Sequence, residues 1–87
     1  MRFSVVFTEA SEEEFLSLPK SIQRRIKDAI TKKLEVDPIS FGKPLRYSWK
    51  GHRSLRVGDY RIIYKVEEKA ILVEIIKVDI RSDVYDN

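Results

Sequence analysis

A tight β-hairpin is the element that this sequence specifies most strongly, because two alternating runs of apolar and polar residues flank Gly58-Asp59. A two-residue turn at that dipeptide sets Arg56 directly opposite Arg61 on one face. The other face then carries residues that suit a hydrophobic core, namely Leu55, Val57, Tyr60 and Ile62. Like charges opposed across two strands destabilise a sheet. We therefore expect the arginine pair to lie on an exposed face and to bind an anion, and phosphate fits the planar arginine fork.

The length and composition of the chain restrict its class. Residues 1–87 are enough for one domain with a single core, and 43% hydrophobic with 36% charged residues is typical of a globular protein. There is no cysteine and His52 is the only histidine, so we expect no disulfide, no metal site and no cofactor. No apolar run could span a bilayer, and the start of the chain lacks a signal-peptide pattern, which predicts a cytoplasmic location.

Two helices and two further strands are predicted around the hairpin. Residues 2–7 form a first strand rich in Val and Phe. Thr8 caps a first helix, or Ser11 does so one turn later, and Pro19 ends that helix. A second helix runs from there to Asp37-Pro38, with one apolar stripe at helical spacing formed by Ile22, Ile26, Ala29, Ile30 and Leu34.

The remaining segments complete an α+β fold in the order β-α-α-β-β-β. Residues 39–48 are a loop or an irregular strand, and residues 51–57 and 60–66 are the hairpin strands. Residues 70–78 form a last strand whose apolar residues fall on both parities, which favours a central place in the sheet. The predicted architecture is a helical hairpin packed on one face of a mainly antiparallel four-stranded sheet. The other face is expected to be open and lined by the arginines.

Basic side chains gather in the second half of the chain. Residues 41–66 carry seven of them against Asp59 alone, whereas residues 67–87 are acidic overall. The seven are Lys43, Arg46, Lys50, Arg53, Arg56, Arg61 and Lys65. A local excess of this size attracts polyanions, and an interleaved aromatic residue such as Trp49 is typical of nucleic-acid sites. A merely solvated basic surface is the alternative. Tyr60, Tyr64 and Phe41 are expected in the core, while Trp49 fits packing and binding equally well.

Two segments match a known pattern. One is Leu-Arg-Val-Gly-Asp-Tyr-Arg-Ile-Ile-Tyr at 55–64, and the other is Lys-Val-Asp-Ile-Arg-Ser-Asp-Val-Tyr at 77–85, after an apolar strand. With Thr8-Glu9-Ala10 before an acidic helix and Leu18-Pro19 between helices, the chain resembles the RelE/ParE superfamily of type II toxin–antitoxin toxins. The resemblance covers nearly the whole chain, favours the RelE branch and implies a RelE-like fold.

This resemblance implies a ribosome-dependent mRNA endonuclease that inhibits translation and is neutralised by a cognate antitoxin. Such toxins act in the ribosomal A site without a metal. The messenger's 2′-hydroxyl attacks the adjacent phosphate and leaves a 2′,3′-cyclic phosphate and a 5′-hydroxyl. The chemistry needs a base, cations around the phosphorane and an acid for the leaving oxygen. The implied partners are the antitoxin, in a heterocomplex, and the ribosome with its mRNA; no membrane is involved.

The resemblance also implies roles for individual residues. Arg61 would stabilise the phosphorane, Arg81 would contact the phosphate or the leaving group, and Tyr85 would stack on a base or handle a proton. Arg56 matches the basic residue before the hairpin turn. The further residues expected to bind RNA or phosphate are Lys50, Arg46 and Lys65.

The first hairpin strand departs from the family pattern. Active relatives often carry lysines there, where this chain has His52 and Ser54. His52 is then a candidate base, since an imidazole exchanges protons near neutral pH. Two other functions stay open. One is a ParE-like gyrase inhibitor that acts by protein contact, and the other is a catalytically weak relative that binds nucleic acid.

Overall fold

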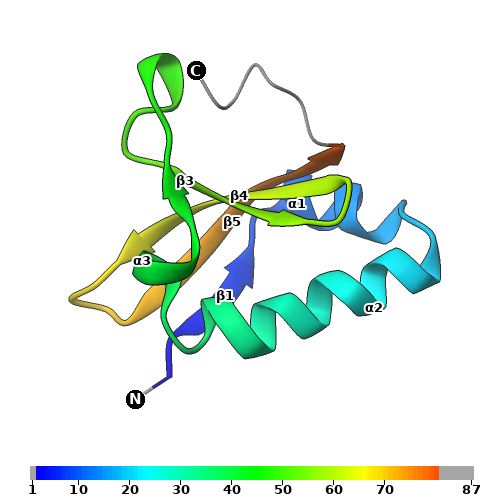
Figure 1. Ribbon diagram of the computed structural model, residues 1–87, viewed down its shortest axis with the longest axis horizontal. Coiled ribbons are helices and arrows are strands. Elements are labelled where there is room, and N and C mark those ends of the chain that lie inside the picture. The colour runs from blue at the N-terminus through cyan, green and yellow to red at the C-terminus, as the bar shows by residue number, and fades with distance from the viewer. Residues whose placement is uncertain (1, 81–87) are drawn as a thin grey trace.

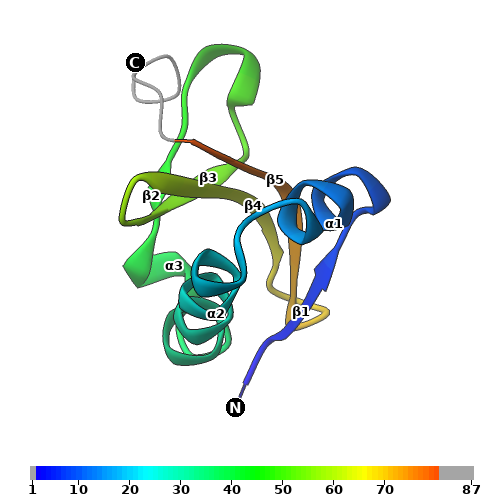
Figure 2. The same cartoon turned by 90° about the vertical axis from the view of Figure 1, so that its right-hand side faces the viewer.

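The computed structural model describes residues 2–80 as a two-layer α+β fold (Figures 1 and 2). The strands are β1 (Ser4–Phe7), β2 (Lys43–Pro44), β3 (Arg53–Val57), β4 (Tyr60–Glu67) and β5 (Leu72–Ile80). The helices are α1 (Glu9–Leu16), α2 (Lys20–Ala29) and α3 (Pro38–Phe41), with a π-helical turn η1 (Ile30–Leu34) that continues α2 and a 3₁₀ turn η2 (Tyr47–Trp49). No helix within residues 2–80 is long and apolar enough to cross a membrane.

The sheet has five strands in the order β1-β5-β4-β3-β2, with β1 parallel to β5 and all other neighbours antiparallel. The predicted α+β class and the central place of the last strand are confirmed. The expected count of four strands is wrong, because β2 adds a two-residue edge strand. Pro44 has no N–H group to donate to a neighbouring strand, which is why proline in a sheet is found at its edges. A strand of two residues is also too short to show an alternating pattern of apolar and polar residues in the sequence.

One hydrophobic core lies between the helices and the sheet. The predicted stripe on α2 and η1 faces it, with Ile26 and Leu34 fully buried and Ile30 only 8% exposed. Phe15 of α1 belongs to the same cluster, so α1 and α2 cover the same face. From the sheet the cluster takes Leu55, Ile62, Tyr64, Val73, Ile75 and Val78. Burial at about 25 cal/mol per Å² of apolar area makes this layer the main source of stability.

Helix α1 is attached to the edge of β5 by polar contacts. Thr8 caps the helix as predicted, since its side chain accepts the Ser11 N–H at 3.1 Å. The Ser11 hydroxyl is fully buried and donates to the Ile75 carbonyl at 2.7 Å. Where β1 ends, Glu14 replaces it as a partner of β5, because one carboxylate oxygen accepts the Val78 N–H at 2.9 Å and the other binds Lys77 Nζ at 2.8 Å.

Tyr64 fixes the short helix α3 against the sheet. Its side chain is fully buried and its hydroxyl donates to the Pro38 carbonyl at 2.6 Å. Arg53 binds the other end of α3, because its guanidinium donates to the carbonyls of Ile39 and Gly42. This network holds the chain in place at the start of β2, near the beginning of the basic stretch of residues 41–66.

The burial of Tyr64 predicts a loss of stability at alkaline pH. Desolvation raises the pKa of the Tyr64 hydroxyl above its usual value near 10.0. The folded state therefore favours the neutral phenol. This contribution is fully present below pH about 10, the unfolded value, and is lost as pH rises through the raised folded value. Unfolding by urea between neutral pH and pH about 11 measures the loss. Tyr64→Phe is the control and should show a flatter dependence; equal slopes would contradict this account.

Candidate nucleic-acid interface

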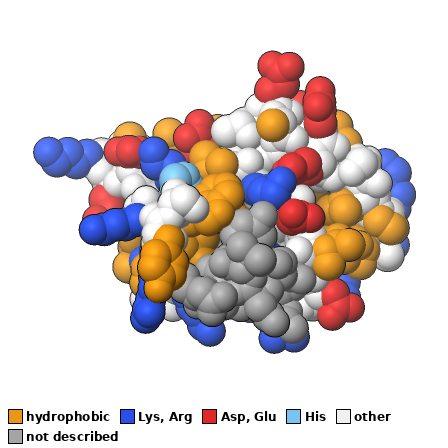
Figure 3. Space-filling model, turned by 90° about the horizontal axis from the view of Figure 1, so that it is seen from above, with side chains coloured by type: hydrophobic (Ala, Val, Ile, Leu, Met, Phe, Trp, Pro, Cys, Tyr) orange, Lys and Arg blue, Asp and Glu red, His pale blue; other side chains and the backbone are white. Residues whose placement is uncertain are grey.

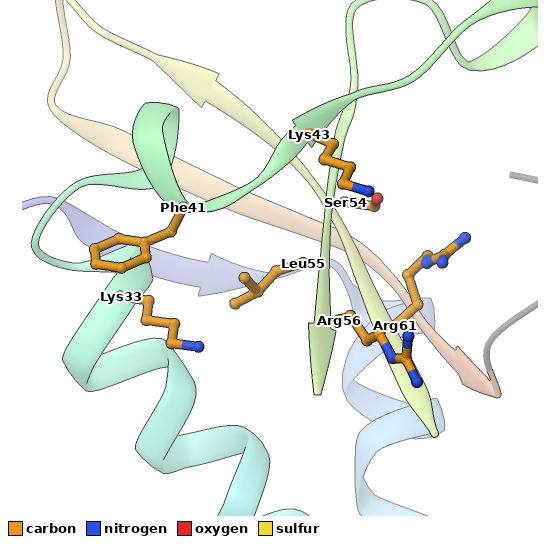
Figure 4. A pocket seen from close by; sticks show the side chains of 7 residues that line it. All are labelled: Lys33, Phe41, Lys43, Ser54, Leu55, Arg56 and Arg61. Carbon is orange, nitrogen blue, oxygen red and sulfur yellow. The ribbon is translucent and has the colours of Figure 1, made fainter. Parts of the chain in front are cut away.

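The hairpin places two arginines opposite each other, as the sequence predicts. Val57 pairs with Tyr60 and Arg56 with Arg61 across β3 and β4. Arg56 is exposed, and its Nε donates to the Gly58 carbonyl at 3.1 Å, which turns the side chain toward the end of the hairpin. The pair places two cations on one face of the hairpin near its turn, with the two guanidinium groups turned in different directions (Figure 4).

The expectation that Arg61 lies on an open face is wrong, because Arg61 is only 4% exposed. β4 is an inner strand, so Arg61 lies between Arg56 on β3 and Asp79 on β5. The face that it shares with Ser54 and Ile63 is likewise not open, since these residues are 5% and 0% exposed. Sequence alternation gives the face of a strand residue but not the depth at which it lies. A guanidinium in this position is largely desolvated and restricted in orientation.

A basic pocket of about 300 Å³ lies beside the arginine pair. Figure 4 shows Arg56 and Arg61 at one end of it, Lys33 and Phe41 at the other, and Lys43 with Ser54 between β2 and β3. Because β2 pairs only with Arg53 and Ser54, the rest of β3 has no strand neighbour on that side, and this open edge forms the pocket. The pocket therefore combines one cation from the η1 turn and one from each of the three strands β2, β3 and β4 with the Phe41 ring.

Sequence reasoning missed two lining residues, Lys33 and Phe41. Lys33 lies on η1 just before the buried Leu34. It lies near the hairpin only because of the way in which α2 and η1 pack on the sheet. Phe41 was expected in the core, yet its side chain is 47% exposed at the end of α3. Of the other two aromatic residues assigned to the core, Tyr64 is fully buried, as predicted, and Tyr60 is half-buried.

A second hollow of about 270 Å³ extends the basic surface along α2. It shares Lys33 and Arg56 with the first pocket and adds Arg25 and Lys32. Asp28 is its one acidic lining residue, and its carboxylate binds Lys32 at 3.3 Å. The two hollows form one groove of positive potential between α2 and the hairpin, which suits an extended polyanion.

His52 lies apart from this groove. It immediately precedes β3, is half-buried, and meets the Trp49 ring edge-on at a centroid distance of 5.3 Å. It lines a separate hollow of about 220 Å³ with Pro44, Arg53 and other residues, and neither Arg56 nor Arg61 lines that hollow. The structure therefore does not bring the proposed base into the arginine pocket.

The other predicted site residues lie at different places. Arg46 and Lys50 are exposed on either side of η2, and Lys65 is exposed on β4 opposite Glu74. Lys65 lies four strand residues from Arg61, or about 13 Å at 3.3 Å per residue. Arg81 and Tyr85 lie outside the described residues.

The fold and the basic groove define a small α+β domain with cations gathered beside an exposed hairpin. Comparison with known proteins identifies the family. Residues 5–85 match the model for the ParE toxin of the type II toxin–antitoxin system parDE. The chain is 33% identical over 85 residues to toxin RelG of Mycobacterium tuberculosis, with 98% of both chains covered, and 32% identical over 83 residues to toxin RelE of the same organism, with 95% of this chain and 86% of the relative covered.

Solved structures agree with this assignment. The M. tuberculosis toxin–antitoxin complex RelBE2 contains a chain that superposes with a TM-score of 0.87 at 31% identity, covering 95% of each chain. The isolated Escherichia coli RelE toxin shares the fold with a TM-score of 0.75 at 23% identity, covering 97% of this chain and 92% of that one. The chain belongs to the RelE/ParE superfamily of type II toxin–antitoxin toxins. The named relatives favour its RelE branch.

Proposed function

We propose that this toxin is a metal-independent endoribonuclease that cuts mRNA on the ribosome, and hence that it acts in the cytoplasm. The opposed pair Arg56 and Arg61 beside the basic pocket is the observation that carries the proposal. Phosphodiester cleavage builds negative charge on the phosphorane oxygens, and fixed cations stabilise that charge more in the transition state than in the ground state. The family membership supports the same reaction.

The proposed reaction needs no reagent beyond the RNA. The 2′-oxygen forms a bond to phosphorus while the bond from phosphorus to the 5′-oxygen breaks, which gives a 2′,3′-cyclic phosphate and a 5′-hydroxyl. A base takes the 2′-hydroxyl proton, and an acid returns a proton to the leaving oxygen. Arg61, with its restricted orientation, suits the phosphorane, whereas the exposed Arg56 suits capture of the incoming phosphate. Arg81 and Tyr85 are proposed as the further contacts at the leaving group.

Three groups are candidates for the base that accepts the 2′-hydroxyl proton. His52 is the candidate that the sequence offers, and it lines a hollow apart from the arginine pocket. Lys50, two residues before it, and the ribosomal RNA are the other candidates. If His52→Ala leaves cleavage on the ribosome unchanged, one of those two groups accepts the proton.

Primer extension on a reporter mRNA tests the proposal. The toxin should produce cleavage sites only when ribosomes translate the message, and the 3′ ends should carry a cyclic phosphate. A magnesium-free chase after ribosome binding should not prevent cutting. If the toxin produces no such ends while cells still stop growing, the nuclease assignment is wrong.

A ParE-like action is the second candidate, because the family model that matches residues 5–85 is that of a ParE toxin. Such a toxin would arrest growth through DNA gyrase by protein contact. Trapped gyrase–DNA complexes and induced DNA damage, without mRNA cleavage, would favour this candidate. The basic groove would then serve as a surface for an acidic protein.

We also propose that a cognate antitoxin covers the basic groove. A relative of this chain was crystallised as the RelBE2 toxin–antitoxin complex, and residues 41–66 carry a net excess of six positive charges. Opposite charge on the partner steers the encounter.

The antitoxin association rate should therefore fall steeply with ionic strength. We expect a drop of about tenfold or more between low salt and roughly 0.5 M, where the Debye length shrinks to a few ångströms. Stopped-flow mixing of the purified partners measures the rate. Lys69→Ala, in the turn after β4 and away from the groove, is the control and should keep the wild-type salt dependence. A rate indifferent to salt would contradict the proposal.

A further inference from the structure

The loop of residues 45–52 projects from the end of the sheet between β2 and β3, as the green segment at the top of Figures 1 and 2. It is a built structure closed at its base, where the Leu45 N–H donates to the His52 carbonyl at 2.9 Å. Leu45 itself is buried, with 6% of its surface exposed. Inside the loop, the N–H groups of Trp49 and Lys50 donate to the carbonyls of Arg46 and Tyr47. The loop thus presents its side chains from an anchored frame.

Tyr47 at the tip of this loop contributes nothing evident to the fold. Its side chain is 78% exposed, the highest value among the large exposed hydrophobic residues of the described chain. Its backbone has φ of +57°, a left-handed conformation that a bulky residue rarely adopts and that glycine adopts freely. Within residues 2–80 its ring takes part in no hydrogen bond, ion pair or ring contact. A left-handed backbone conformation that presents an exposed aromatic ring without a packing role indicates a ligand.

The surroundings of Tyr47 have the chemistry of a single-stranded RNA site. Arg46 precedes it, Lys50 follows the turn, and both are exposed. Trp49 lies edge-on to His52 in the same loop. Figure 3 shows hydrophobic and basic side chains together on the face around the histidine. Proteins bind unpaired RNA by stacking bases on aromatic rings while cations hold the adjacent phosphates.

We propose that the 45–52 loop binds one unpaired nucleotide of RNA, with its base stacked on Tyr47 and its phosphate held by Arg46 and Lys50. The inference rests on the proposed function, since RNA is the substrate of that function. β3 connects the loop to the arginine pair, with His52 and Arg56 about 13 Å apart at 3.3 Å per residue. The contact made by Tyr47 and Arg46 at the tip of the loop therefore holds a nucleotide outside the cleaved dinucleotide, and this contact adds affinity rather than chemistry, whichever group accepts the 2′-hydroxyl proton.

Trp49 is the only tryptophan of the chain, so its fluorescence reports on the loop itself. The test titrates the toxin with a short RNA whose 2′-oxygens are methylated, which blocks self-cleavage, and with an abasic strand of the same length. Tyr47→Gly should weaken binding of the RNA roughly tenfold or more, the loss expected for one stacked base. It should leave binding of the abasic strand unchanged. Tyr47→Phe should retain wild-type affinity, because the ring remains.

Two controls separate stacking from stability. Tyr47→Gly removes the backbone strain, so its melting temperature should equal or exceed that of the wild type even though RNA binding falls. Leu16→Ala removes another exposed apolar side chain, on α1 and away from the loop, and should leave RNA affinity unchanged. If Tyr47→Gly binds the RNA as tightly as the wild type, the assignment is overturned.

Other outcomes overturn the assignment in a recognisable way. If Tyr47→Gly keeps RNA affinity and instead loses antitoxin affinity, the loop is a protein-docking site. If it loses affinity for the RNA and the abasic strand alike, the contact is electrostatic rather than stacking. The proposed function fails separately, as an absence of ribosome-dependent cleavage by the wild-type toxin, which the direct binding measurement does not involve.

Discussion

Arg61→Ala should slow mRNA cleavage on the ribosome by about a hundredfold or more. Removing a positioned cation from the phosphorane forfeits roughly 2–4 kcal/mol of transition-state stabilisation. The effect should fall on kcat more than on KM, because the charge that Arg61 meets is largest in the transition state. Arg61→Lys should recover part of the rate, since lysine keeps the charge and loses the planar fork. Single-turnover cleavage of a defined ribosome–mRNA complex measures these rates.

Because Arg61 is only 4% exposed, its replacement needs a test of the fold beside the test of activity. Thermal unfolding and circular dichroism of Arg61→Ala and Arg61→Lys supply it. Arg56→Ala gives an independent variant, because Arg56 is exposed and its loss should leave stability within about 0.5 kcal/mol. We expect Arg56→Ala to act mainly on KM. If folded Arg56→Ala and Arg61→Ala both cleave at the wild-type rate, the pocket is not the site of the chemistry.

Gly42→Ala should destabilise the fold by about 2–4 kcal/mol, as expected for overpacking combined with loss of a buried hydrogen bond. A Cβ at position 42 would lie 1.8 Å from the Tyr64 hydroxyl oxygen and 3.0 Å from the Ser54 carbonyl oxygen. The Tyr64 ring cannot withdraw, since it is fully buried and donates to Pro38 at 2.6 Å. Urea unfolding of the two proteins measures the difference in free energy of unfolding.

A double-mutant cycle identifies the clash. In a Tyr64→Phe background the hydroxyl is gone, so Gly42→Ala should cost less than in the wild type by about 1 kcal/mol or more. Rescue should be partial, because the ring carbon that bears the hydroxyl would still lie 2.8 Å from the new Cβ. Equal costs in the two backgrounds would mean that Tyr64 is not what forbids a side chain at position 42.

The hairpin and the helices were determined locally. The Gly58-Asp59 turn sets the register in which Arg56 faces Arg61, because a two-residue turn leaves only one pairing. The apolar spacing from Ile22 to Leu34 directs one stripe of the second helix inward, as Ile26 and Leu34 confirm. These features depend on residues close in sequence, so composition and periodicity predict them. The family could likewise be inferred, since its pattern lies in the same segments.

Tertiary packing decided the features that involve residues far apart in sequence. Lys33 and Phe41 reach the arginine pocket only because α2, η1 and α3 pack beside the edge of β3. Glu14 reaches Val78 because α1 lies where β1 ends. Strand β2 has only two residues, so no alternation of apolar and polar side chains reveals it in the sequence. In each case the contact depends on the direction in which a helix leaves the sheet, which short-range patterns do not encode.

By itself, the sequence determined the α+β class, the hairpin register, the inward stripe of the second helix and the concentration of positive charge in residues 41–66. Only the tertiary structure decided the depth of each charge. Arg61 is buried while Arg56 is exposed, although both lie on one face of one hairpin. Alternation assigns a side chain to a face, but its exposure depends on the side chains that cover that face at each point. Lys65 shows this, because it is exposed although it lies on the same inner strand β4 as the buried Arg61.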